Sequence, residues 1–462
     1  LAKKWHVDST GTLYTFTLKN ELYFHEHPLF MNKEDRKVRS RDFVASFNRI
    51  LDPKTASPGS WIFNGIVSQY EPFRAINDST FQIKLNKSFP PFAGILCMKY
   101  CSVLPKKLLD NPNYELRKEP VGTGPFAFGS YFPDEKLIFY RNNNYHQRDE
   151  GDIKALEISF IPGKQNEFLA FRQGQLDWIS GLDKSFKDKI LEREGDLKTQ
   201  FQNDFQFSKI SFLNLEYLGI LIGSKGADEF QNQQVRLALN YAIDREKLLT
   251  YLRNGIGSPG VEGPVPPSLK KYSLADSLIY GYNPERARRL VEKSGLDPNS
   301  INITLQTNPN YLDLSLFIKK QIEEIGVSVE IEVLQSSFLR QLMQKGESPF
   351  FRASWIADYP DPENYLTLFY SKNKAPNGPN YTHYSNATFD SLYEASLTET
   401  DIEKRSTIYA QLEVIIQNDA PIIPLYYDEV VWLFSNKWQM PKEHPLNLID
   451  LWSLKMKTDQ LN

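Results

Sequence analysis

The chain has 462 residues, too many for a single hydrophobic core, so its length predicts two or more lobes. Apolar residues make up 41% of the sequence and aromatic residues 13%, which suits packed cores and a ligand site lined by rings. The net charge is −3 with both signs interspersed. A nucleic-acid-binding protein would carry a basic stripe, so this composition argues against a nucleic-acid partner.

The sequence contains no apolar run near 18 residues, so no segment is predicted to span a membrane. It opens at Leu1 without an initiator methionine or a signal peptide, and we expect a processed or truncated piece. The two cysteines, Cys97 and Cys101, lie four residues apart in a run that looks extended. That spacing favours buried small apolar side chains over a disulfide or half of a metal site.

In the first part of the chain, alternating strands are predicted over 12–18 and 80–85. Between them, residues 40–53 form a predicted capped amphipathic helix that Pro53 terminates. His25 and His27 occupy alternate positions of an extended run, where a metal would need a further ligand at suitable spacing. None follows, so we predict no metal site.

Glycines flank Thr123 in the run 120–126, but no Lys or Ser/Thr opens a following helix, which argues against a phosphate loop. Strands are predicted over 137–141 and 156–161, and a helix over 166–173. The run 201–223 is aromatic and β-branched. In the following helical pattern, Val235 and Leu239 share one face, and the periodicity alone predicts that Arg236 is exposed.

A strand over 301–306, a helix over 314–325 and a strand over 327–334 predict a right-handed crossover in a parallel or mixed sheet. The aromatic run 350–356 is a further strand. It must end there, because Pro360 and Pro362 remove two backbone donors, and a helix is predicted to start near Pro362. Two helices, over 386–397 and 403–417, and a strand over 419–427 complete the pattern.

The end of the predicted strand 350–356 carries Trp355 and Asp358 into a loop, the position where open α/β sheets bind ligands. The run Trp-Ile-Ala-Asp-Tyr-Pro-Asp-Pro at 355–362 resembles the ligand loop of the periplasmic oligopeptide- and dipeptide-binding proteins, the solute-binding subunits of peptide ABC importers. Other stretches resemble the same family in the same order, namely 1–25, 120–126, 174–178, 235–245 and 419–427.

The resemblance implies that Asp358 pairs with the α-ammonium of a bound peptide, and that Arg352 contacts the peptide carboxylate, as in some members. A buried ammonium needs a carboxylate, and a guanidinium suits a carboxylate. The residues alone leave another interpretation open, with Arg352 solvated on its strand and Asp358 in an Asx-turn or an N-cap. Further predicted ligand-binding residues are Trp355, Tyr359, Tyr217 and Asn310.

The implied fold class is α/β, with the two-lobed periplasmic-binding-protein-like fold, mixed sheets and a small extra α/β lobe. Residues 1–121 would form the small lobe, and 210–424 the second ligand-binding lobe. The basal lobe would comprise 122–209 and 425–462, with its N-terminal part expected to be absent. A hinge is expected near 208–216 and 424–430.

The expected function is that of an extracytoplasmic solute-binding protein, lipid-anchored or secreted, that delivers short peptides to a membrane ABC permease and ATPase complex. We expect a monomer without a cofactor or catalytic residues. Two alternatives stay open. The same fold could bind an oligosaccharide, a metal chelate or haem, or the protein could be a hydrolase that uses Asp358 with Asp361 or Glu363.

Overall fold

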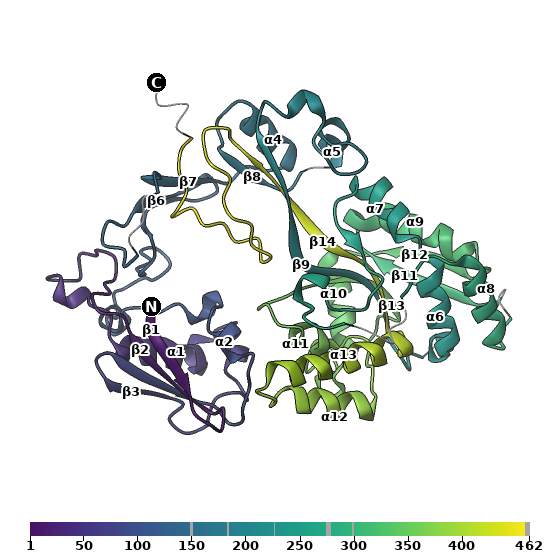
Figure 1. Ribbon diagram of the computed structural model, residues 1–462, viewed down its shortest axis with the longest axis horizontal. Helices are drawn as coiled ribbons and strands as arrows, with labels where there is room; N and C mark the ends of the chain where they lie inside the picture. The colour runs from purple at the N-terminus through teal and green to yellow at the C-terminus, as the bar shows by residue number, and fades with distance from the viewer. Residues whose placement is uncertain (148–150, 183, 226, 274–278, 298–299, 458–462) are drawn as a thin grey trace.

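The computed structural model describes residues 1–147, 151–182, 184–225, 227–273, 279–297 and 300–457 of the protein (Figure 1). The last residues of the predicted basal segment, 458–462, lie outside this description. The strands are β1 Ala2–Val7, β2 Leu13–Leu18, β3 Phe73–Asn77, β4 Thr80–Lys84, β5 Phe126–Phe132, β6 Lys136–Arg141, β7 Ala155–Ser159, β8 Trp178–Ser180, β9 Gln206–Ile220, β10 Ser258–Pro259, β11 Asn302–Thr307, β12 Ser328–Val333, β13 Phe350–Ile356 and β14 Ile422–Phe434.

The helices are α1 Ser40–Leu51, α2 Phe92–Ile95, α3 Lys106–Leu109, α4 Lys164–Arg172, α5 Lys184–Ile190, α6 Gln233–Ala242, α7 Arg245–Arg253, α8 Pro284–Lys293, α9 Leu312–Glu323, α10 Ser336–Lys345, α11 Glu363–Leu366, α12 Ala387–Ser396 and α13 Ile402–Asp419. In the described part of the chain, none of them combines the length and the apolar character needed to cross a bilayer. Most of the strands and helices that periodicity predicts are confirmed, and their ends differ from the predicted ends by a few residues.

The N-terminal elements form a four-stranded antiparallel sheet in the order β1-β2-β4-β3, covered by α1 (Figure 1). Phe43 of α1 stacks on Phe81 of β4, with ring centroids 4.5 Å apart. Phe47 packs edge-on against Phe73 of β3. Aromatic rings thus pack this helix against the sheet.

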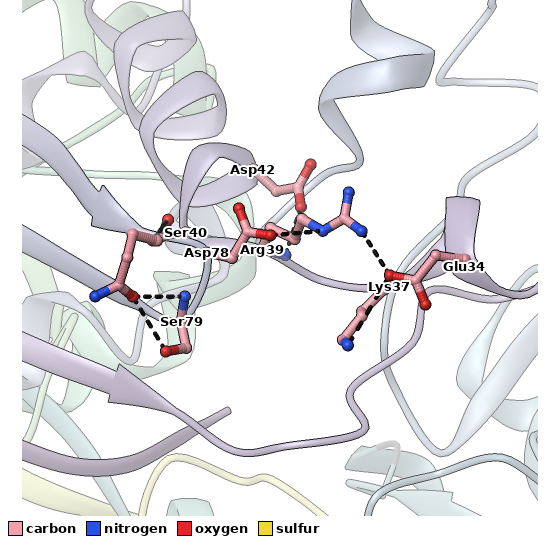
Figure 2. A network of polar contacts seen from close by, with 8 residues as sticks. Glu34, Lys37, Arg39, Ser40, Asp42, Asp78 and Ser79 are labelled. Carbon is pink, nitrogen blue, oxygen red and sulfur yellow. Dashed lines mark hydrogen bonds and ion pairs between the residues drawn. The ribbon is translucent and has the colours of Figure 1, made fainter.

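The N-terminus of α1 is held by charged groups rather than by a serine cap (Figure 2). Asp42, in the first turn, accepts a hydrogen bond from the backbone N–H of Arg39 at 2.7 Å and one from that of Lys106 at 2.9 Å. The Arg39 guanidinium lies between Glu34 at 2.6 Å and Asp78 at 3.4 Å. An acid near a helix N-terminus stabilises the helix dipole, which explains why this helix begins here.

Two long strands, β9 and β14, run side by side from the elements near β8 into a second group of helices (Figure 1). They belong to a seven-stranded sheet in the order β10-β14-β9-β13-β11-β12, with β8 paired to β14. Two register shifts interrupt the β14 ladder, between Pro424 and Tyr426 and between Tyr427 and Glu429. These shifts fall within the segment where a hinge is expected, and the hinge itself stays a prediction.

The seven-stranded sheet is mixed, because β11 pairs in parallel with β12 and β13 while β13 runs antiparallel to β9. The parallel pairing predicted for β11 and β12, with α9 between them in the chain, is confirmed, and the handedness of this crossover stays a prediction. Successive residues of β13 point to opposite faces. Phe350 packs into the core formed with α6, α8 and α9, and Phe351 into the core formed with α12 and α13. The sheet therefore lies between two helical layers.

A smaller antiparallel sheet, β5-β6-β7, lies between the N-terminal sheet and the long strands. Next to it, a cavity of about 770 Å³ is lined by β7, β8 and the C-terminal segment, including Leu156, Trp178 and Leu454. Predicted strands over 137–141 and 156–161 are confirmed in this sheet. The division of the chain into lobes at the predicted boundaries stays a prediction.

Two expectations from the sequence are wrong. Arg236 is only 7% exposed, because its guanidinium donates to the backbone carbonyls of Asp419, Phe230 and Gln231, which helical periodicity does not reveal. Cys97 is exposed and Cys101 half-buried, since the segment around them forms short helical turns instead of a strand, and both thiols are free.

A close approach between β9 and β13 makes Gly219 sensitive to substitution. A Cβ atom at this position would lie 2.3 Å from Cζ of the fully buried Phe351 ring. We expect Gly219→Ala to lower the free energy of unfolding by about 1–3 kcal/mol, measured by urea denaturation, because the ring cannot move without strain. Gly281→Ala is the matched control, since its Cβ would meet no atom within 4 Å. Equal losses in both variants would contradict this packing.

Candidate functional site

The loop 357–362 between β13 and α11 is fixed by one buried amide. Oδ1 of Asn364 accepts hydrogen bonds from the indole N–H of Trp355 and from the backbone N–H of Asp358, both at 3.1 Å. Asn364 is 3% exposed, so water does not compete for its carbonyl. Trp355 and Asp358, which the sequence placed in one ligand loop, are thus brought together by Asn364.

The Asp358 carboxyl is exposed to solvent and, within the described residues, accepts no hydrogen bond and forms no ion pair. Surrounding protein nevertheless desolvates it enough to raise its pKa, while the ammonium of Lys99 in the N-terminal part of the chain acts in the opposite direction. Such a carboxyl is chemically ready to receive a cation.

Tyr359 joins this loop to the N-terminal sheet region. Its side chain is 6% exposed and belongs to the hydrophobic cluster of residues 14–121. A Cβ atom on Gly94 would lie 3.1 Å from Cβ of Tyr359, which shows how closely the two segments approach. The ring therefore contacts the hydrophobic core of the N-terminal sheet, and its role toward a ligand stays a prediction.

The two other acids of the loop are engaged within the protein. Glu363, 4% exposed, accepts hydrogen bonds from the hydroxyls of Tyr359 and Tyr393, and burial raises its pKa. Asp361 accepts from the Tyr409 hydroxyl at 2.8 Å and lies 3.7 Å from Arg405. Both carboxylates brace the loop, which leaves Asp358 as the acid of this loop that is open to a ligand.

Arg352 forms a buried bidentate ion pair with Glu216 of β9. Its Nη2 donates to Oε2 of Glu216 at 2.5 Å, and its Nε donates to Oε1. The two side chains are 10% and 1% exposed. The Tyr311 ring covers the guanidinium, with its centroid 3.2 Å from Cζ of Arg352. Burial raises the pKa of Glu216, and the guanidinium opposes that shift.

The structure places Tyr217 in a buried hydrophobic cluster and Asn310 beside a cavity. Tyr217 is 3% exposed and points into the core shared with Phe351, on the face of the sheet opposite to Arg352. Asn310 lines a cavity of about 270 Å³ together with Arg253, Tyr311 and Tyr426. The structure therefore groups Trp355 with Asp358, and the ligand contacts predicted for Tyr217 and Asn310 stay predictions.

Sequence reasoning missed Glu216 and Asn364. An acid within the otherwise apolar run 215–220 is a signal for a buried ion pair, because an unpaired carboxylate there would be very costly. Asn364 has no comparable signal, since an asparagine in the first turn of a helix is commonly exposed. Among the described residues, no cluster of three or more His, Cys, Asp or Glu side chains could hold a metal ion. His25 and His27 instead contact the Gly124 carbonyl and Glu119, each at 2.9 Å.

Replacing Asn364 with alanine tests the role of the amide in positioning the loop. We expect Asn364→Ala to lower the free energy of unfolding by about 1–3 kcal/mol, because two partly buried donors lose their acceptor. The emission of Trp355 should also shift, which a purely global destabilisation would not cause in the folded state. Fluorescence and urea unfolding provide the measurements, with Asn377→Ala, an exposed amide, as control. An unchanged tryptophan spectrum would contradict this role.

Comparison with known proteins places these features in a family. Residues 1–377 match the model of the bacterial extracellular solute-binding proteins, family 5 (middle region). Heme-binding protein A of Haemophilus influenzae is 27% identical over 445 residues, covering 92% of this chain and 78% of the relative. The dipeptide-binding protein of Escherichia coli is 24% identical, covering 93% and 81%.

Solved structures agree in fold. The periplasmic binding protein DppA from Helicobacter pylori, in complex with the peptide STSA, superimposes with a TM-score of 0.79 at 26% identity, covering 99% of this chain and 88% of that one. HbpA2 from Haemophilus parasuis gives a TM-score of 0.85 at 24% identity, covering 99% and 90%. The predicted fold class is confirmed. The chain belongs to the bacterial extracellular solute-binding proteins of family 5.

Proposed function

We propose that this protein captures short peptides outside the cytoplasm and delivers them to an ABC importer, with Asp358 binding the peptide ammonium. The observation that carries the proposal is the Asp358 carboxyl, which is accessible, desolvated and unpaired among the described residues. A carboxylate in such a setting gains a strong charge-assisted hydrogen bond from an ammonium. Binding rather than catalysis is proposed, because the neighbouring acids Asp361 and Glu363 are held by tyrosines.

The proposal extends to location and partners. The family is extracellular, and we place this chain outside the cytoplasm as a monomer that docks onto a membrane permease, with or without a lipid anchor. Relatives named as dipeptide-binding proteins in Escherichia coli and Bacillus subtilis support a peptide cargo. Lobe closure around the peptide would use the long strands β9 and β14, which connect the two groups of elements.

The test is to identify what the purified protein retains and what stabilises it. Native mass spectrometry is expected to show peptide adducts that disappear after partial unfolding and dialysis. A synthetic pool of random tripeptides should then raise the Tm of the stripped protein, because a ligand that binds only the folded state stabilises it by mass action. Absence of peptide adducts, together with no Tm change, would contradict a peptide cargo.

A second candidate is haem, favoured by the 27% identity to Heme-binding protein A of Haemophilus influenzae. The absorption spectrum of the same protein sample distinguishes a haem cargo from a peptide cargo, because bound haem gives a Soret absorption band and a peptide does not. Titration of the stripped protein with haemin should leave the Tm unchanged if the cargo is a peptide. A haemin-dependent rise in Tm with a shifted Soret band would favour haem.

A further inference from the structure

We propose that helix α13 positions the ligand loop 357–362 by fixing it to the proline-rich segment 262–272, so that Tyr409 and Tyr272 are positioning residues for ligand binding. The inference rests on the proposed function, since it concerns how the loop that carries Asp358 is held ready for its ligand. It depends on a row of polar side chains on α13 that contacts both segments.

Helix α13 carries this polar row on a side that is largely buried, where a helix usually presents apolar side chains. The members of the row are spaced by four residues and therefore lie along one side of the helix. They are Arg405, Tyr409, Glu413 and Gln417. Arg405 is half-buried and the other three are buried. Buried polar groups need partners, and Tyr409 and Glu413 find them in two different segments.

Tyr409 holds the ligand loop. Its hydroxyl donates to Oδ1 of Asp361 at 2.8 Å, and the same oxygen accepts the backbone N–H of Glu363, in the first turn of α11, at 3.0 Å. Helix α11 carries Asn364, whose side chain accepts the backbone N–H of Asp358 at 3.1 Å. Tyr409 therefore acts on Asp358 through the start of α11, without touching it.

One turn further along α13, Glu413 holds the proline-rich segment. Its Oε1 accepts the backbone N–H of Val265 at 3.1 Å, and its Oε2 accepts the Tyr272 hydroxyl at 3.0 Å. It also forms an ion pair at 3.3 Å with Lys270, whose side chain is 6% exposed. A Cβ atom on Gly263 would lie 3.1 Å from Oε1 of Glu413, so the backbone lies directly against this carboxylate. A buried ion pair of this kind fixes one arrangement, because displacement leaves a charge unpaired.

The two sets of contacts lie close to one another. Tyr409 and Glu413 are separated by one turn of a single helix. Burial and the Glu413 carboxylate raise the pKa of the Tyr272 hydroxyl, and Tyr409 and Asp361 contribute in the same direction, so these groups share one region of the protein. A helix transmits a displacement as a rigid element. Loosening the proline-rich segment should therefore loosen the ligand loop as well.

Three tyrosine variants test the inference, since each removes one hydroxyl and keeps the ring. Tyr409→Phe and Tyr272→Phe each remove one contact of the polar row. Tyr384→Phe is the matched control. Its hydroxyl also donates to a carboxylate of α13, that of Asp419, but this residue is the last of the helix and lies outside the row.

Hydrogen exchange of the ligand-free protein, measured by mass spectrometry, reports on the loop directly. Tyr409→Phe and Tyr272→Phe should both speed exchange in residues 357–366 by about threefold or more, relative to the N-terminal sheet. Calorimetry of the stripped protein then uses the free tripeptide pool, which consists of random tripeptides with both ends unblocked. Its dissociation constant should rise about tenfold in Tyr409→Phe and about threefold in Tyr272→Phe, since one hydrogen bond or part of one is lost. Tyr384→Phe should leave both quantities within about twofold of the wild type.

The exchange and binding measurements separate this inference from the proposed function. Unchanged exchange of residues 357–366 in Tyr409→Phe, or a rise in Tyr272→Phe that stays within 262–272, overturns the link through α13 even if peptides bind. An equal rise in Tyr384→Phe overturns it too, because the effect would then be general. If the wild type binds no tripeptide but exchange changes as expected, the peptide function fails and the link through α13 stands.

Discussion

Asp358→Asn is expected to weaken binding of the free tripeptide pool by roughly 2–5 kcal/mol, the cost of removing one member of a desolvated ion pair. The asparagine side chain has the same shape but cannot neutralise an ammonium. Calorimetric titration of the stripped protein measures the effect. The Tm of the unliganded variant should not fall, because the Asp358 carboxyl makes no hydrogen bond or ion pair within the described residues.

Glu330→Gln serves as the matched control, since it removes one exposed negative charge from β12 of the same sheet. Its affinity should equal that of the wild type. The pH dependence provides an independent check. Binding needs an ionised Asp358, and burial raises the pKa of this carboxyl. As the pH is lowered, affinity should therefore begin to fall at a higher pH than for an ordinary aspartate. A variant that retains wild-type affinity would eliminate Asp358 as the binding group.

Arg352→Leu should lower the free energy of unfolding by about 3–5 kcal/mol at about pH 8, because Glu216 would remain buried without its cation. The sign of the pH effect follows from the carboxyl. Burial raises the pKa of Glu216 above its unfolded value, and loss of the guanidinium raises it further. Stability is then lost as pH rises from the unfolded to the folded pKa. The loss should consequently be smaller at about pH 5 than at about pH 8.

Adding Glu216→Gln to Arg352→Leu should restore much of the lost stability, because the buried charge is then removed together with its partner. Urea unfolding of the two single variants and the double variant completes the cycle. The matched control is Arg340→Leu, which removes an arginine from the exposed face of α10. Additive losses in the double variant would show that Arg352 and Glu216 do not depend on one another.

Together, the binding measurements on Asp358→Asn and the unfolding measurements on Arg352→Leu distinguish a residue that binds the ligand from one that stabilises the fold. Asp358 should matter for affinity and little for stability, whereas Arg352 should matter for stability. The contrast follows from exposure and pairing, because Asp358 is open and unpaired among the described residues, and Arg352 is covered by Tyr311 and paired with Glu216. The two residues stand six positions apart in one run, but their expected roles diverge.

Periodicity in the sequence was sufficient to predict most strands and helices. Alternation predicted β2 and β4, and the apolar spacing over 314–325 predicted α9 between two parallel strands. Prolines predicted the end of β13 and the start of α11 within a few residues. These features are local: they depend on side-chain spacing and on the donors that proline lacks, and both can be read without knowing which segments meet.

Pairs of residues distant along the chain could not be predicted in this way. Glu216 and Arg352 lie 136 residues apart, and Arg236 reaches the carbonyl of Asp419 across 183 residues. No periodic pattern shows that a charged side chain will contact a buried acid or a backbone carbonyl that lacks a hydrogen-bond donor. Such pairing depends on how sheets and helices assemble. The amino-acid sequence predicts Asp358 and Arg352 as charged residues of the candidate site, but it does not reveal Glu216. Their pairing follows from the fold, which neutralises Arg352 inside the protein and leaves Asp358 without an internal partner among the described residues.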